Sequence, residues 1–308
     1  MVKKIQVQTF WSLLVLLLAV VGNAEAKLKV VATLPSLADI ARNVGGDDVD
    51  VVSLTKGNQD PHFVDAKPDL VIQLNRADLL IRVGLGLEDG WLPPLQVNSR
   101  NGKIQTGSEG NLEASQAVEL KEVPKGALDR SQGDVHPGGN PHFMLDPRNG
   151  VKVARAIEAR LARLDASKAA DYKKRGDAYV KDLEQKIKGW ETALKPLKGR
   201  AVVPYHKSWI YFEEWVGLQE AGTVEPKPGI PPSPEHVVKL IQMMREKKVG
   251  LMLIEPYYPR STAEHVAQET KAKLVTLPTE PFGTPGSSDD AKTYFGVFDA
   301  IVARLKGV

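Results

Sequence analysis

Two blocks of alternating strand and helix patterns, separated by one long helical stretch, constrain the fold of this chain most. Each block contains three short runs rich in β-branched or apolar residues: 28–33, 49–54 and 79–83 in the first, and 200–204, 249–254 and 273–277 in the second. Strands separated by helical patterns predict a parallel sheet with helices on its faces. We therefore predict an α/β fold of two lobes with mainly parallel central sheets.

The stretch between the blocks predicts one long helix. After a helix that ends near Leu164, Asp165 can cap another, whose apolar residues keep three-, four- and seven-residue spacings. A helix of about 30 residues spans roughly 45 Å, enough to run along a two-lobed protein. We predict a rigid linker helix over residues 165–195, between an N-terminal lobe at 27–164 and a C-terminal lobe at 196–308.

The first 26 residues have the pattern of a secretory signal. Lys3 and Lys4 give a positive start, residues 10–21 are almost unbroken apolar sequence, and Ala24 and Ala26 form a small-x-small cleavage site. The apolar run is too short to span a bilayer comfortably. We predict a cleaved signal peptide over residues 1–26 and a soluble mature chain.

Composition excludes several classes of protein. The sequence has no cysteine, which excludes disulfides, thiolate metal sites and a lipid-bearing cysteine. Removing Lys3, Lys4 and Glu25 with the signal leaves 39 basic and 37 acidic side chains, out of 41 and 38. Charges of both signs intermingle, so no nucleic-acid partner is expected. We expect a monomer that diffuses freely in a periplasm.

Three of the 6 histidines stand in similar contexts. His62 follows an Asp-Pro pair, His142 an Asn-Pro pair and His206 a Pro-Tyr pair. Neutral imidazole is the commonest metal ligand, and proline fixes the backbone that aims it. Because ligands of open parallel sheets sit beyond the carboxyl ends of the strands, we expect the three side chains to converge on one ion between the lobes.

The fourth ligand is less defined. A carboxylate suits a divalent ion held by three histidines, and Glu280, in the loop after residues 273–277, is the first candidate. Glu255, which follows the strand at 249–254, is the competitor, either as a ligand or as a partner that holds a histidine ring. Water is the third possibility.

The other three histidines are not expected in the ligand set. His136 lies in a segment at 98–139 that has little periodicity, and it either captures metal transiently or is an ordinary loop residue. His236 follows a helix cap, and His265 lies on a predicted helix. Both are expected to be solvated.

At these residues the chain resembles the periplasmic metal-binding proteins of zinc and manganese ABC transporters, the cluster A-I solute-binding family. The resemblance covers essentially the whole mature chain and is carried, in order, by Gly57–His62 (GNQDPH), Gly84–Glu88 (GLGLE), Asn140–Pro147 (NPHFMLDP), Tyr205–His206, Ile254–Pro256 and Glu280–Gly283 (EPFG). It implies two α/β lobes bridged by a rigid helix, a metal between them, and delivery to a membrane permease.

The resemblance also implies the ligands. His62, His142 and His206 match the family's first three positions, and Glu280 stands where the family usually has aspartate. The manganese branch tends to carry glutamate at the third position. His206 stands there in this chain and favours zinc, because manganese prefers oxygen ligands. Many zinc members have a long histidine-rich loop before the second position, where this chain has only His136.

We therefore predict a high-affinity periplasmic zinc-binding protein, without catalysis, that delivers Zn²⁺ to an ABC permease. A manganese-binding member of the same family is the alternative. A zinc hydrolase is a further one, because three histidines with an open fourth position also form a catalytic set. A metallochaperone or adhesin would share every residue, and a periplasmic metallochaperone is a possible partner.

Overall fold

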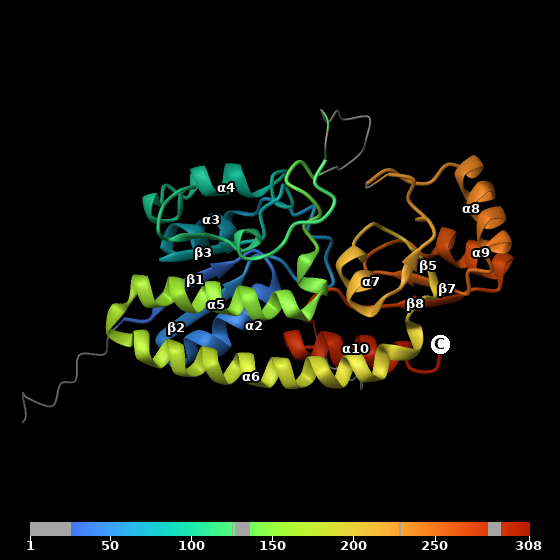
Figure 1. Cartoon of the computed structure of the whole chain (residues 1–308). Coiled ribbons are helices and arrows are strands. Elements are labelled where there is room, and N and C mark those ends of the chain that lie inside the picture. Colours follow the sequence, from blue (N-terminus) through green and yellow to red (C-terminus); the bar gives the residue numbers. More distant parts are fainter. Residues whose placement is uncertain (1–25, 125, 127–135, 228, 283–290) are drawn as a thin grey trace, which may run out of the picture.

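The computed structural model describes residues 26–124, 126, 136–227, 229–282 and 291–308. The predicted signal peptide, apart from its last residue, lies outside the described residues, as do Gly283 and part of the segment at 98–139. Two four-stranded sheets lie side by side, and one long helix runs along both (Figure 1). The predicted fold class is confirmed.

The N-terminal sheet has the strand order β2-β1-β3-β4, and every neighbouring pair is parallel. Its strands are β1 (Leu28–Ala32), β2 (Val49–Ser53), β3 (Leu79–Arg82) and β4 (Asn111–Glu113). Apolar side chains attach helices to both faces. The helices are α2 (Pro35–Gly45) and α5 (Pro147–Leu164) on one face, and α3 (Pro68–Arg76) and α4 (Leu92–Asn98) on the other.

The C-terminal sheet repeats this arrangement with the order β6-β5-β7-β8, again all parallel. Its strands are β5 (Ala201–Pro204), β6 (Gln219–Glu220), β7 (Leu251–Ile254) and β8 (Lys273–Thr276). One face packs against α8 (Pro234–Glu246) and α9 (Arg260–Thr270), and α7 (Ile210–Val216) lies on the other. Short β5 and β7 are buried along most of their length, as expected for central parallel strands.

The predicted long helix is present as α6 (Ala169–Leu194). Its 26 residues span about 39 Å, and its apolar positions, including Tyr172, Leu183 and Trp190, are buried. It begins later than residue 165 because Ala166–Lys168 form a separate 3₁₀ turn. The lobe boundaries stay predictions.

The last helix, α10 (Tyr294–Leu305), returns to α6 and also touches α2. Together these helices place side chains of both lobes in one apolar cluster, from Ile40 of α2 to Leu253 of β7. A shared core of this kind opposes large hinge movements. Within the described ranges, none of the helices is long and apolar enough to cross a membrane.

Candidate metal centre

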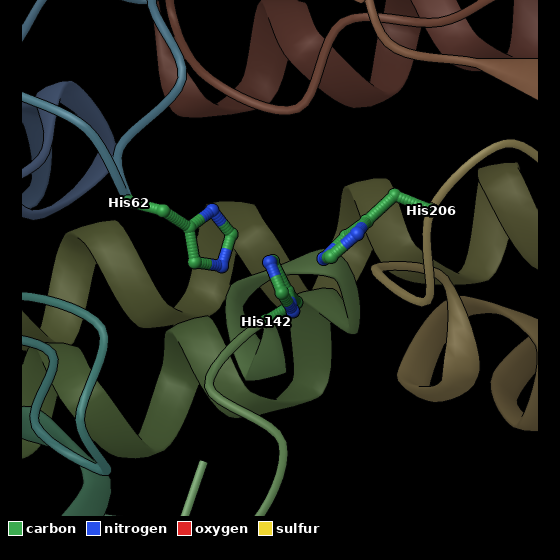
Figure 2. A group of neighbouring side chains, drawn as sticks. All are labelled: His62, His142 and His206. Carbon is green, nitrogen blue, oxygen red and sulfur yellow. The ribbon is translucent and has the colours of Figure 1, made fainter. Parts of the chain in front are cut away.

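The structure brings three of the predicted ligands together between the lobes. His62 comes from the loop between β2 and α3, His142 from the turn before α5, and His206 from the segment just after β5. The three side chains point toward one another (Figure 2). One ligand nitrogen from each lies within 4.8 Å of those of the other two.

The spacing of the rings fits a tetrahedral ion. The ring centres are 5.3 Å apart for His62 and His142, 5.3 Å for His62 and His206, and 5.4 Å for His142 and His206. With Zn–N bonds of about 2.0–2.1 Å and ring centres about 1.1 Å farther out, tetrahedral geometry puts ring centres about 5.2 Å apart. The three rings therefore already have the separations that one ion requires.

Each of these rings is oriented by a hydrogen bond at Nδ1. The acceptors are Asp60 Oδ1 for His62 at 2.7 Å, Asn140 Oδ1 for His142 at 3.0 Å and Glu225 Oε2 for His206 at 2.7 Å. Because these oxygens accept, Nδ1 carries the hydrogen and Nε2 keeps its lone pair. Partners of this kind fix the tautomer and the direction of a metal-binding histidine.

His62 and His142 are presented by the same local turn. The main-chain N–H of His62 donates to Asp60 Oδ1 at 3.0 Å, and that of His142 donates to Asn140 Oδ1 at 3.0 Å. One side-chain oxygen thus binds both the backbone and the ring of the residue two positions later, a local bond that Asp and Asn favour in turns. The Asx-Pro-His sequence therefore builds a ligand together with its orienting group.

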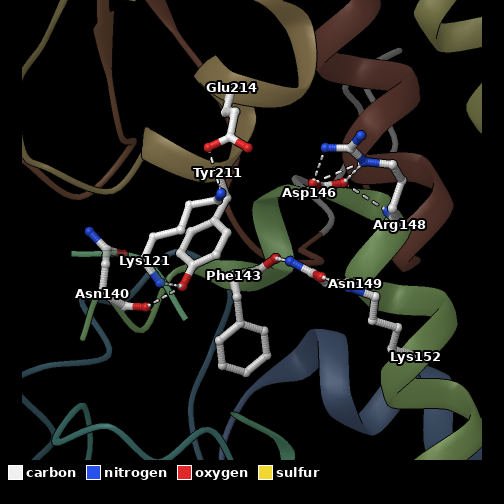
Figure 3. A network of polar contacts seen from close by, with 9 residues as sticks. All are labelled: Lys121, Asn140, Phe143, Asp146, Arg148, Asn149, Lys152, Tyr211 and Glu214. Carbon is white, nitrogen blue, oxygen red and sulfur yellow. Dashed lines mark hydrogen bonds and ion pairs between the residues drawn. The ribbon is translucent and has the colours of Figure 1, made fainter. Parts of the chain in front are cut away.

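The turn that carries His142 is also held by the C-terminal lobe. Asn140 Nδ2 donates to the carbonyl of Lys207 at 2.8 Å. The Tyr211 hydroxyl donates to the Asn140 carbonyl at 3.0 Å (Figure 3). On the other side, Asn149 Nδ2 donates to the carbonyl of Phe143 at 3.0 Å. The position of His142 therefore depends on residues of both lobes.

Burial favours the neutral form of two of the three rings. It holds the pKa of His142 well below its usual value, and the neighbouring rings act in the same direction. Burial also lowers the pKa of His206, although the hydrogen bond to Glu225 partly opposes the shift. For Asp60, burial alone would raise the pKa, but the contacts with His62 bring it below its usual value. Neutral imidazoles are the form that binds metal.

Glu280 does not belong to this group. Among the described histidine and carboxylate side chains, the 4.8 Å group consists of His62, His142 and His206. The two oxygens of Glu280 instead accept from Ser36 at the start of α2, from its main-chain N–H at 2.8 Å and from its hydroxyl at 3.1 Å. Burial raises the pKa of Glu280 to about 7. The carboxylate serves as a cap for α2 from the other lobe.

One oxygen of Glu255 is also bound elsewhere. Glu255 is fully buried, and its Oε1 accepts from the indole of Trp209 at 2.9 Å. Burial raises its pKa to about 8. The carboxylate that orients the His206 ring is instead Glu225, which the sequence did not single out. Glu225 lies beside Tyr205, and its main-chain N–H donates to the Tyr205 carbonyl at 2.9 Å. The pairing of β6 with β5 brings the two residues together, and that register is the feature from which the role of Glu225 could have been inferred.

His136, which was not expected in the ligand set, lies beside the centre. Its ring centre is 5.3 Å from that of His62 and 6.2 Å from that of His142. Its Nε2 is buried and, like the Nε2 atoms of those two residues, has no hydrogen-bond partner among the described residues. Burial lowers its pKa to about 3. By contrast, His236 contacts the Thr223 carbonyl, and His265 is exposed on α9.

An open pocket of about 620 Å³ lies against His62 and His136. Asp65, Asp89 and Trp91 contribute to its walls. The carboxylates attract cations, so the pocket is a suitable approach for a metal ion from solvent.

Comparisons with known proteins agree with this geometry. The family model for the periplasmic component A of the zinc-uptake complex matches residues 30–308. The chain therefore belongs to this family of extracytoplasmic solute-binding proteins of metal ABC transporters. It is accordingly a binding protein and not an enzyme, and its class works with a membrane permease. The predicted family and the expected absence of catalysis are confirmed.

Individual relatives differ in the metal they are named for. The manganese ABC transporter substrate-binding lipoprotein PsaA of Streptococcus mitis is 26% identical over 292 residues, with 92% of this chain and 91% of the relative covered. The metal ABC transporter substrate-binding lipoprotein FimA of Streptococcus parasanguinis is 27% identical over 277 residues, covering 87% and 86%.

Solved structures share the fold. A crystal structure of ZnuA has a TM-score of 0.71 at 23% identity, covering 90% of this chain and 99% of the other. A Mn-bound periplasmic metal binding protein from Candidatus Liberibacter asiaticus has a TM-score of 0.72 at 22% identity, with the same coverage.

Proposed function

We propose that this protein captures Zn²⁺ between its lobes with His62, His142 and His206, and delivers the ion to a membrane ABC permease for import. The observation that carries the proposal is the set of three imidazoles at tetrahedral spacing, each with Nδ1 committed to an acceptor. Such a set has three rings that point toward one another, each with Nε2 free to bind the ion.

Zinc is favoured over manganese by the ligand type. Three neutral nitrogen donors suit Zn²⁺, whereas Mn²⁺ prefers carboxylate, carbonyl and water oxygens. Manganese remains the alternative, because relatives such as PsaA are named for it. Under this alternative, oxygen ligands would have to enter the group.

Glu280 as the fourth ligand remains a prediction from the sequence. Metal binding would require its carboxylate to leave at least one of the two bonds with Ser36. That movement would uncap the first turn of α2, which lacks a side-chain cap of its own. The proposed ligand set therefore consists of the three histidines.

We also propose that the chain is secreted with a cleaved signal peptide and acts as a monomer without a lipid anchor. The relatives cited above are lipoproteins. This sequence contains no cysteine, the residue that would carry the lipid. The permease is the proposed partner, and a periplasmic metallochaperone is a second one.

Equilibrium dialysis of the chelator-stripped protein against Zn²⁺ tests the function. We expect one zinc per chain, and loss of that zinc in His142→Ala at concentrations that saturate the wild type. His265→Ala is the matched control, because it removes an exposed histidine distant from the centre in the sequence and on another element. Equal zinc retention by His142→Ala and the control would contradict the proposal.

A further inference from the structure

His136 lies against the His62 side of the histidine group. Its ring is as close to His62 as the rings of His142 and His206 are, with 5.3 Å between centres in each case. Its Nε2 is buried without a hydrogen-bond partner among the described residues. A buried, unpartnered ring nitrogen is costly unless something binds it. In this position the available ligand is a metal ion.

The segment that carries His136 is closely packed against the turn after β3. A Cβ placed on Gly86 would lie 3.2 Å from Pro137 Cδ and 3.5 Å from His136 Nδ1. A Cβ on Gly138 would lie 2.7 Å from Leu85 Cδ2. Gly86 also has a φ of 95°, which favours glycine. Two glycines therefore permit the close approach that places His136 beside His62.

We propose that His136 supplies the fourth nitrogen ligand of the ion bound by His62, His142 and His206. This inference rests on the proposed function and adds a residue to its site. His136 lies outside the 4.8 Å group. For tetrahedral geometry its ring must therefore move toward His142, from the present 6.2 Å to about 5.2 Å, and reach a similar separation from His206.

The competing carboxylates lie outside the 4.8 Å group of ligand atoms. Glu280 binds Ser36 with both oxygens. Glu255 binds Trp209 through Oε1, while its buried Oε2 has no hydrogen-bond partner among the described residues. A carboxylate ligand is also not needed for charge, because Asp60 and Glu225 already face the ion through the rings of His62 and His206. These two carboxylates, which bind the histidine rings and not the ion, balance the charge of a divalent cation held by four neutral nitrogens.

His136 also lies at the entrance through which an ion would reach the centre. It lines the open pocket of about 620 Å³ together with His62. The fourth ligand therefore stands on the side from which the ion is proposed to enter, and its binding would close the centre to water. A zinc ion with four protein ligands has no site for an activated water, as in structural zinc sites.

X-ray absorption at the zinc edge tests the proposal by counting imidazoles. We expect four imidazoles in the zinc-loaded wild type and in His265→Ala. In His136→Ala we expect three imidazoles and one oxygen. Zinc affinity, measured by competition with a chelator, should fall in this variant by at least about tenfold. That is the smallest loss typical of removing a residue that hydrogen-bonds to a metal ligand.

Further variants separate this inference from the proposed function. Glu280→Gln should leave the four-imidazole spectrum unchanged. Three imidazoles in the wild type, or wild-type affinity in His136→Ala, would overturn the role of His136 while leaving the three-histidine site intact. If His142→Ala also bound zinc like the wild type, the proposed function itself would fail. Circular dichroism of each apo variant checks that it is folded.

Discussion

His62 and His142 are aimed by an acceptor two residues earlier in the chain, whereas His206 is aimed by Glu225, 19 residues away. The first two rings therefore take their orientation from a three-residue turn, and the turn of His142 is held in place by both lobes. The third depends on the pairing of β6 with β5, which brings Glu225 alongside Tyr205. A local turn fixes the orientation of a ligand ring without help from distant residues. Long-range pairing fixes that orientation only when the lobe is folded.

Removal of the long-range ligand should have the largest effect on zinc binding. We expect His206→Ala to weaken zinc by more than about 100-fold, since loss of a ligand should exceed the 10–100-fold cost of losing an outer partner. His142→Ala should cause a similar loss. Chelator competition measures both. A wild-type affinity in His206→Ala would show that the C-terminal lobe contributes no ligand.

Substitution of the acceptors that orient the histidine rings tests the difference between the local turns and the long-range pairing. Glu225→Ala leaves the His206 ring without its acceptor and should weaken zinc by about 10–100-fold. Asp60→Asn should cost less than about tenfold, because it converts the first turn into a copy of the second, in which Asn140 performs the same task. The same competition assay applies. A larger loss in Asp60→Asn than in Glu225→Ala would reverse the proposed difference.

Acid should release zinc later than unperturbed imidazoles would predict. Protons compete with the metal for each ring, and a lowered pKa weakens that competition. Three histidines with a pKa of about 6.5 would cost roughly eightfold in affinity at pH 6.5. Burial lowers the pKa values of His142 and His206, so we expect a loss of less than about threefold at pH 6.5 and release only at lower pH.

Competition titrations at pH 7.5, 6.5, 5.5 and 5 follow this dependence. An affinity that rose as the pH fell would contradict the involvement of imidazoles, because protons compete with the metal for each ring. An eightfold loss already at pH 6.5 would instead show that the rings titrate as in water.

The smallest effect on zinc is expected at Glu280. Glu280→Ala should weaken zinc less than His206→Ala does, because the structure has its oxygens on Ser36. It should still lower the stability of the apo protein by about 1–3 kcal/mol, since the buried N–H and hydroxyl of Ser36 lose their acceptor. Thermal unfolding and chelator competition separate the two effects. Equal zinc losses in Glu280→Ala and His206→Ala would make Glu280 a full ligand.

Sequence periodicity predicted much of the fold because the central strands are short, buried and β-branched. It missed β4 and β6, which are only three and two residues long and include polar side chains. These edge strands exist because a neighbouring strand offers free backbone groups, and no local pattern reports that. The long helix was predicted because its apolar face repeats over seven turns.

The residues of the metal centre also fall into those that the sequence could predict and those that it could not. His62, His142 and His206 could be singled out from their turn-like contexts and their places after strands. Glu225 and His136 could not, because their roles depend on strand register and on the packing of Gly86 and Gly138. Glu280 matched a family motif, but its contact with Ser36 joins residues 244 positions apart. Only tertiary structure shows such a contact.

The most direct test of the three-histidine centre is a crystal structure of the zinc-loaded protein with anomalous scattering recorded at the zinc edge. We predict one peak between the lobes, about 2.0–2.1 Å from Nε2 of His62, His142 and His206. A peak bound by carboxylate oxygens without His206, or a peak elsewhere on the molecule, would contradict the account.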